Sequence, residues 1–234
     1  TTDQLLLDYT NGGQRIAYLL GDKRGLLVFA LIFAVIKDFA EENMGCESRI
    51  VSGLNNVFSK TDRGIRIKTR RGRGERSLID RLLVSKVQME DVHMPFTVNM
   101  FYFCDPDGHS PYVQNQELMP VDEMTPKIGT LTIQDVNCTG VDASFACIYG
   151  LPEMPVERIE LKQITASYLP ESERKPACPI MMDNFDELSG KSFYLRNAKQ
   201  VLIQDVTIIG SADQEPLLMN IEEPVIQNLV YQES

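Results

Sequence analysis

One basic segment, positions 60–76, holds the side chains best suited to chemistry. It contains eight Lys or Arg residues and two acidic ones, whereas the whole chain carries a net charge of −10. Successive side chains of a strand point to opposite faces, so Ile65 and Ile67 would face a core and Arg66 and Lys68 would face outward, about 7 Å apart. A guanidinium fork beside a compact ammonium group suits a carboxylate. The segment therefore predicts an anion-binding site.

Three more arginines, Arg70, Arg71 and Arg73, follow in a glycine-punctuated turn. We expect them to add positive potential at the same edge. Two other interpretations are a solvated, charge-rich strand and an arginine–glycine contact with RNA. The acidic net charge and the absence of stacking aromatic residues inside the segment argue against a nucleic-acid partner.

The elements that position this segment belong to a repeat. The apolar spacing Φ-x-x-Φ-x-Φ-x-x-Φ recurs, and in each case it is followed by a second alternating run. The first pattern begins at Ile79, Ile128, Val156 and Ala198, and the spacing places a shorter copy at Ile226. Short strands at this rhythm predict an all-β solenoid of stacked coils; a β-sandwich is the competing interpretation.

The repeat divides the chain into residues 1–50, an atypical N-terminal segment without the coil pattern, and residues 51–234, the stacked coils. The longest apolar run, Leu26–Ile36, is too short for a membrane helix, which needs about 20 residues. We expect it to cap the solenoid, as a helix, and we expect no membrane contact. Two insertions, Cys104–Pro126 and Leu169–Ser189, lengthen turns where solenoids place binding surfaces. The five cysteines form no paired motif, which favours free thiols and leans toward the cytoplasm.

Three motifs in the same order resemble one known family. They are Thr-Asp-Arg-Gly-Ile-Arg-Ile-Lys-Thr-Arg-Arg-Gly-Arg-Gly at 61–74, Pro95-Phe-Thr-Val-Asn-Met-Phe-Tyr102, and Tyr149-Gly-Leu-Pro-Glu-Met-Pro155. From about Ser52 onward the chain resembles the C-terminal part of glycoside hydrolase family 28, the polygalacturonases.

The resemblance implies a right-handed parallel β-helix. It also implies inverting hydrolysis of α-linked galacturonan in pectin by paired carboxylates, with no metal and no cofactor. In that family the Arg-Ile-Lys pair binds the carboxylate of a galacturonate residue, which falls on Arg66 and Lys68. A tyrosine one coil later lines the cleft, and Tyr102 matches it. Galacturonan or an oligogalacturonate is the partner that these residues imply.

The sequence departs from the family at its catalytic motifs. It contains no Asn-Thr-Asp, no Asp-Asp pair and no Gly-His-Gly, so no catalytic residue is assigned. We expect no hydrolysis by this chain alone; Asp62, Glu153 and Asp183 are the first candidates if replacements exist. Truncation, a frame-shifted reading frame and degeneration all remain open as origins. A non-catalytic β-helical module that binds acidic polysaccharide is the alternative function, and a purely structural solenoid is a third.

Overall fold

The computed structural model describes residues 4–10, 14–20, 50–54, 56–74 and 77–233 of the chain. The described elements are almost all strands. The first group is β1 (Gln4–Thr10), β2 (Gln14–Leu20), β3 (Ile50–Leu54), β4 (Val57–Ser59), β5 (Arg63–Lys68), β6 (Leu78–Ile79), β7 (Leu82–Glu90) and β8 (Met94–Asn99). The second group is β9 (Lys127–Ile128), β10 (Thr130–Val141), β11 (Ser144–Tyr149), β12 (Val156–Tyr168), β13 (Lys191–Ile209) and β14 (Leu217–Gln232). The short helices are α2 (Pro111–Gln114) and the 3-10 turn η1 (Glu171–Glu173).

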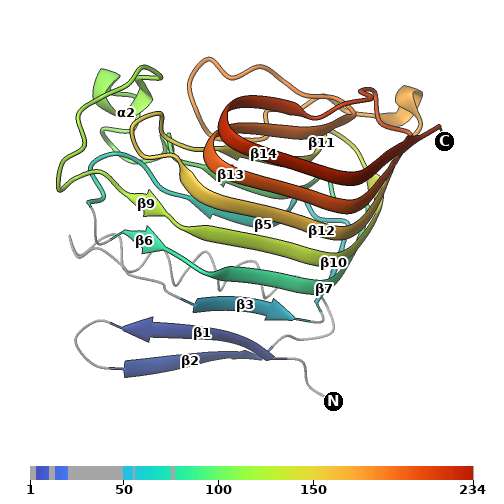
Figure 1. Cartoon of the computed structure of the whole chain (residues 1–234), viewed down its shortest axis with the longest axis horizontal. Coiled ribbons are helices and arrows are strands. Elements are labelled where there is room, and N and C mark those ends of the chain that lie inside the picture. Colours follow the sequence, from blue (N-terminus) through green and yellow to red (C-terminus); the bar gives the residue numbers. More distant parts are fainter. Residues whose placement is uncertain (1–3, 11–13, 21–49, 55, 75–76, 234) are drawn as a thin grey trace.

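From β3 onward the strands stack in parallel, one coil above another (Figure 1). One wall runs β3, β7, β10, β12 and the C-terminal part of β13; the other runs β5, β8, β11 and the N-terminal part of β13. β13 belongs to both walls and β14 pairs along its whole length. At the opposite end β1 pairs antiparallel with both β2 and β3. The fold is all-β with mainly parallel strands, as a parallel solenoid requires.

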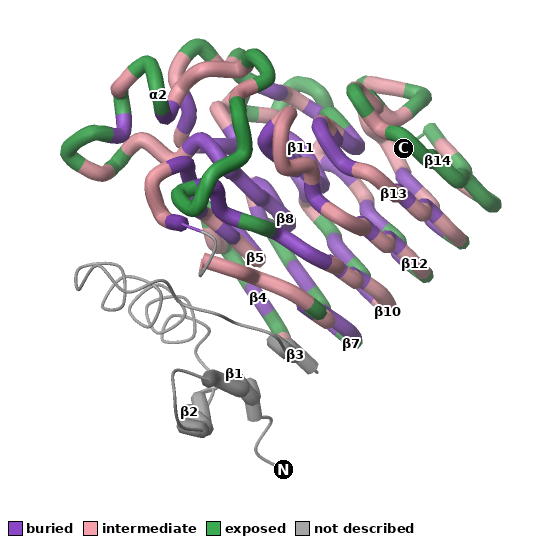
Figure 2. The backbone as a smooth tube through the Cα atoms, turned by 60° about the vertical axis from the view of Figure 1, so that its left-hand side comes forward, coloured by how far each residue is buried: buried purple, intermediate pink, exposed green. Residues whose placement is uncertain are grey.

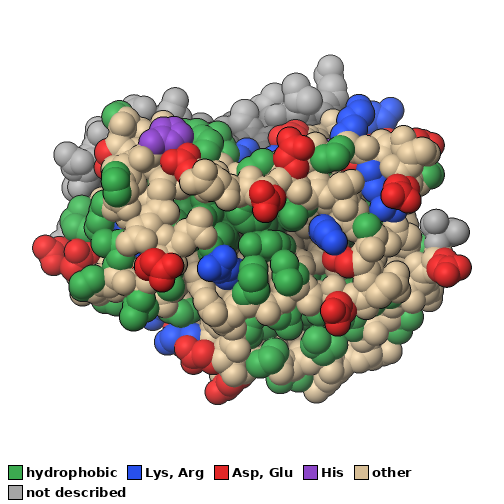
Figure 3. Space-filling view, turned by 90° about the horizontal axis from the view of Figure 1, so that it is seen from above, with side chains coloured by type: hydrophobic (Ala, Val, Ile, Leu, Met, Phe, Trp, Pro, Cys, Tyr) green, Lys and Arg blue, Asp and Glu red, His purple; other side chains and the backbone are tan. Residues whose placement is uncertain are grey.

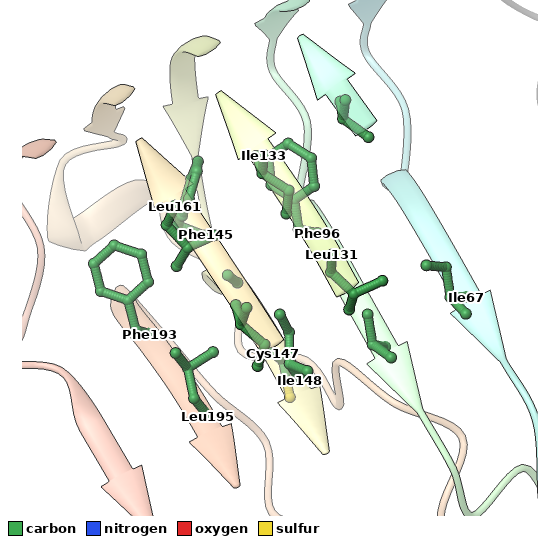
Figure 4. Packing of buried hydrophobic residues seen from close by; sticks show 14 of the residues in the cluster. Ile67, Phe96, Leu131, Ile133, Phe145, Cys147, Ile148, Leu161, Phe193 and Leu195 are labelled. Carbon is green, nitrogen blue, oxygen red and sulfur yellow. The ribbon is translucent and has the colours of Figure 1, made fainter. Parts of the chain in front are cut away.

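The core lies between the two walls and is built from the repeated apolar positions (Figure 4). The side chains of Val84, Ile133, Leu161 and Ile203 are stacked on one wall and are at most 3% exposed. Ile67 faces them from β5 at 6% exposed, which confirms its predicted core position. The other four are the third apolar position of the pattern that begins at Ile79, Ile128, Val156 and Ala198, and we expected them too in the core. Ile65, also predicted to be in the core, is partly buried and packs against the cluster. Figure 2 shows how buried and exposed residues alternate along these strands.

The apolar spacing has a backbone cause. Between its third and fourth apolar positions each coil bends at one residue with positive φ, so that two inward side chains can be three residues apart. These residues are Lys86, Asp135, Gln163, Asp205 and Asn228, with φ between 54° and 55°. Asp and Asn tolerate this left-handed conformation better than most residues because their short polar side chains can hydrogen-bond locally. Asn228 Nδ2 donates to Asp205 Oδ1 at 2.8 Å, so neighbouring bends are also linked through side chains.

The last coil corrects one sequence-based expectation. A shorter copy of the pattern was expected to begin at Ile226, but Ala198 pairs with Ile221 and Ile203 pairs with Ile226. The full pattern is therefore Ile221, Pro224, Ile226 and Leu229, with proline at an apolar position. The expected cap at Leu26–Ile36 lies outside the described residues.

Candidate carboxylate-binding site

β5 presents Arg66 and Lys68 on the same face, opposite to Ile65 and Ile67. The strand pairs in parallel with β8, where Arg66 lies beside Thr97 and Lys68 beside Asn99. Both cationic side chains are only partly exposed. The predicted alternation places them together, but they are not simple surface charges.

The second insertion covers part of this face through Met181. Asn99 Nδ2 donates to the Met181 carbonyl oxygen at 2.8 Å, and the Phe103 backbone amide donates to the same oxygen at 3.3 Å. Met181 Sδ lies 3.9 Å from Lys68 Nζ and 3.7 Å from Cys104 Sγ. The backbone of the insertion is therefore anchored, and its thioether sulfur forms one wall beside the ammonium group.

Lys68 and Tyr102 are in contact. Lys68 Nζ lies 4.3 Å from the centre of the Tyr102 ring, at a distance typical of a cation–π contact. Burial, with a smaller contribution from the neighbouring Arg66 charge, lowers the pKa of Lys68 to about 8. Burial, followed by a hydrogen bond with Cys104, raises the pKa of Tyr102 to about 12. At neutral pH the site therefore holds an ammonium group above a neutral phenol.

Arg66 carries a guanidinium group that forms no ion pair with the described residues. Burial lowers its pKa, and the charge of Asp62 is the main opposing influence. Within the described ranges no carboxylate forms an ion pair with Arg66, and no side chain or carbonyl accepts a hydrogen bond from it. A half-buried cation without a built-in counter-ion favours an anion from outside.

The turn that follows β5 is different, and it corrects the expectation of added positive potential. Arg70 donates to Asp105 at 2.6 Å and to Asp107 at 2.7 Å, and Arg73 donates to Asp105 at 2.5 Å. Burial alone would raise the pKa of Asp105, but hydrogen bonds and charge from Arg70 and Arg73 hold it below its usual value. These arginines hold the first insertion in place, and their charge is neutralised there.

Arg71 is the most buried of the three. Its side chain is 1% exposed and forms two hydrogen bonds with Glu153, at 2.6 and 3.0 Å. Its remaining donor reaches the Asn115 carbonyl oxygen at 2.6 Å, with longer contacts to the carbonyls of Tyr112 and Val113. Arg71 therefore joins the turn, the first insertion and the segment after β11.

The three carboxylates named as possible catalytic replacements are all engaged elsewhere. Asp62 is 72% exposed and pairs with Arg63 at 2.5 Å. Glu153 is 2% exposed and pairs with Arg71. Asp183 Oδ1 lies 2.8 Å from His109 Nδ1, in a pair that joins the two insertions. Each of these carboxylates therefore has a basic partner within the described part of the chain.

Sequence reasoning missed Asn99, Cys104 and Met181. Asn99 could have been found, because it follows the alternation of β8 onto the face of Lys68. The carboxylates of Asp105 and Asp107 also had a signal, since the segment Asp105-Pro-Asp-Gly108 supplies two acids in a turn beside an arginine-rich one. No sequence signal pointed to Met181, because the irregular sequence of a loop does not show which strand the loop crosses.

In the part of the chain that the structure describes, no group of three or more His, Cys, Asp or Glu side chains is arranged to hold a metal ion. The same part contains no helix long and apolar enough to cross a membrane. Cys104, Cys138, Cys147 and Cys178 are free thiols. No protein-family model, curated protein or solved structure matches this chain.

Proposed function

We propose that this chain binds acidic polysaccharide of the galacturonan type, with Arg66 and Lys68 holding a uronate carboxylate and Tyr102 beside the sugar ring, and that it does not hydrolyse the polymer. We also infer that the coils wind as the right-handed parallel β-helix of the polygalacturonases. The observation that carries the proposal is the guanidinium of Arg66, which has no counter-ion among the described residues, in a segment whose next three arginines interact with carboxylates of the protein.

The chemistry of the three side chains is complementary to a uronate. The planar guanidinium can donate two parallel hydrogen bonds to one carboxylate. The ammonium group of Lys68 contributes a second positive charge from the same face, and Met181 and Tyr102 flank it. Partial burial reduces the screening of these charges by water, so each contributes more than a fully exposed cation would.

Affinity from one such site should be modest. Exposed charge pairs contribute ~0–1 kcal/mol each, and desolvation offsets part of the gain for half-buried ones. Two such contacts supply at most about 2 kcal/mol, so a single carboxylate held by two cations corresponds to a Kd of roughly tens of millimolar. Binding should weaken with added salt, because the site remains open to solvent.

The absence of hydrolysis that we propose follows from the state of the carboxylates near the site. An inverting glycosidase needs a general acid with a raised pKa and a second carboxylate, the two roughly 6.5–9.5 Å apart, to activate water. Asp105, the acid attached to the same turn, has its pKa lowered instead. Asp62, Glu153 and Asp183 are held by Arg63, Arg71 and His109.

The test is titration of the protein with trigalacturonate, followed by NMR or calorimetry. Replacing both Arg66 and Lys68 by alanine should abolish binding and leave the unfolding transition in place. A matched control is Arg158→Ala with Lys162→Ala, which removes two cations from the other wall that both contact Glu160. The control variant should bind trigalacturonate as tightly as the parent protein does. A neutral galactose trimer should bind to neither protein.

Equal binding of trigalacturonate to the double variant and the parent would refute the proposed site. Incubation with polygalacturonate tests whether the protein hydrolyses the polymer. We expect no reducing ends above buffer, since general acid catalysis contributes ~10²–10⁴-fold and needs a positioned donor. Turnover that disappears in Asp62→Asn, Glu153→Gln or Asp183→Asn would identify a catalytic carboxylate and contradict the proposal.

A further inference from the structure

β14 is the last described strand of the stack, and one of its edges has no partner among the described strands. Among the described strands it pairs only with β13, along sixteen residues. Figure 1 places it at the end of the stack opposite to β1 and β2, and Figure 2 shows it mostly exposed. A long open edge presents unpaired backbone donors and acceptors to any extended chain.

The apolar layer of β14 is also uncovered. Ile226 continues the column of Leu161 and Ile203, which are fully buried, yet Ile226 is 46% exposed. Val225 and Val230, which alternate onto the opposite face of the strand, are 44% and 39% exposed, and Leu217 at its start is 47% exposed. Viewed from above, hydrophobic side chains reach the surface close to acidic ones (Figure 3). Apolar surface of this kind at the end of a solenoid calls for a covering layer.

Charge determines what that layer can be. On neighbouring strands, the side chains at this position alternate between negative and positive charge. Glu157 on β12 forms an ion pair with Lys199 on β13 at 2.9 Å, and Lys199 also interacts electrostatically with Glu222 on β14. Beside this column Gln200 donates to Glu223 at 2.8 Å. From position 212 to 233 the sequence has five acidic residues and no Lys or Arg. The outer edge therefore presents carboxylates where the next rung would place cations.

We propose that the β14 edge docks an extended segment of another protein, with apolar side chains over Ile226 and Lys or Arg side chains opposite Glu222 and Glu223. Cross-strand pairs of opposite charge stabilise a sheet, and like charges directly opposite one another destabilise it. A second copy of this chain that paired through its own β14 would bring further carboxylates to the edge and no Lys or Arg to meet them, so it is the poorer occupant. Pro224 lacks a backbone N–H and interrupts the strand near these glutamates, which leaves side-chain charge as the main source of selectivity.

Two fluorescent peptides test the proposal. Both copy residues 221–230 with valine in place of Pro224. One keeps the glutamates (IEEVVIQNLV) and the other has lysines there (IKKVVIQNLV); both carry a solubilising polyethylene glycol tail. Measured by fluorescence anisotropy at low salt, the lysine peptide should bind at least tenfold more tightly than the glutamate peptide. In the protein variant Glu222→Lys with Glu223→Lys this preference should reverse.

The variant Ile226→Asp should weaken binding of the lysine peptide by tenfold or more. It should still fold, because that side chain is half exposed. Equal binding of the two peptides, no binding of either, or an unchanged preference in the charge-reversed variant would overturn the proposal. So would a concentration-dependent dimer of the unmodified protein in sedimentation that Ile226→Asp abolishes. None of these outcomes depends on the carboxylate site at Arg66.

Discussion

Two neighbouring regions of this protein use the same residue type in opposite ways. On β5 the guanidinium of Arg66 has no counter-ion among the described residues, and Lys68 lies against a tyrosine ring. A few residues later, in the turn, Arg70, Arg71 and Arg73 interact with carboxylates at 2.5 to 2.7 Å. Sequence separates the two groups by only one residue, Thr69.

The difference lies in what the rest of the chain brings to each place. The first insertion returns Asp105 and Asp107 to the turn, and the segment after β11 returns Glu153. The face of β5 receives Met181 and Tyr102, which have no negative charge at neutral pH. Arginine in the turn therefore stabilises structure, whereas arginine on the strand is available to a ligand.

The largest effect should come from the Arg71–Glu153 pair. Breaking a buried ion pair by removing one partner typically costs 3–5 kcal/mol, because the other charge stays buried and uncompensated. Glu153→Gln should lower the free energy of unfolding by about that amount in a urea titration. Replacing both partners by methionine and leucine should restore much of the loss. If Glu153→Gln left stability within about 0.5 kcal/mol of the parent, Arg71 would not hold the turn in the way described.

The next effect is a pH dependence of ligand binding at Lys68. The pKa of this residue is about 8, so its positive charge is lost between pH 7 and 9 while a uronate stays ionised. Trigalacturonate affinity should therefore fall with rising pH, by about threefold, as expected for the loss of one weak charge contact. Lys68→Arg keeps its charge over this range and should bind with a flat profile. An equally steep fall in that variant would show that another group titrates.

The lowered pKa of Lys68 affects protein stability in the opposite direction: the free energy of unfolding should rise with pH, whereas ligand affinity should fall. The unfolded chain holds the lysine proton up to about 10.5, so between pH 8 and 10.5 it binds more protons than the folded protein. Stability of the parent should therefore rise with pH over this range relative to Lys68→Met. Solvent screening of a half-exposed group should keep the gain near 1 kcal/mol.

Much of the fold could be predicted from sequence, because its determinants are local. The alternation in β5 and the repeated spacing around Ile133 and Leu161 follow from strand geometry and from one bend per coil. The last coil was misplaced because Pro224 occupies an apolar position and hides the pattern that begins at Ile221. A proline is tolerated on an edge strand, but a search for apolar residues at fixed spacing does not count it as part of the pattern.

The site could be predicted only in part. Arg66, Lys68 and Tyr102 lie together because neighbouring coils bring β5 and the end of β8 side by side. The neutralisation of Arg70 and Arg71 depends on how the first insertion and the segment after β11 return to the turn, and residue spacing does not determine those paths. A run of like charges in sequence therefore does not establish a patch of like charge in space.

The smallest expected effect is on the stability of Arg66 variants. Because no described carboxylate depends on this guanidinium, Arg66→Met removes a partly desolvated charge and leaves no buried partner behind. Its long apolar side chain can occupy the same face, and surface changes of this kind usually alter stability by less than about 0.5 kcal/mol. Urea unfolding should therefore show a neutral or slightly stabilised protein, while trigalacturonate binding is lost. Arg71→Met is the matched comparison, with a loss of several kcal/mol expected from the same chemical change. If Arg66→Met destabilised the protein as much as Arg71→Met does, the strand arginine would also be structural, and the division between the two regions would fail.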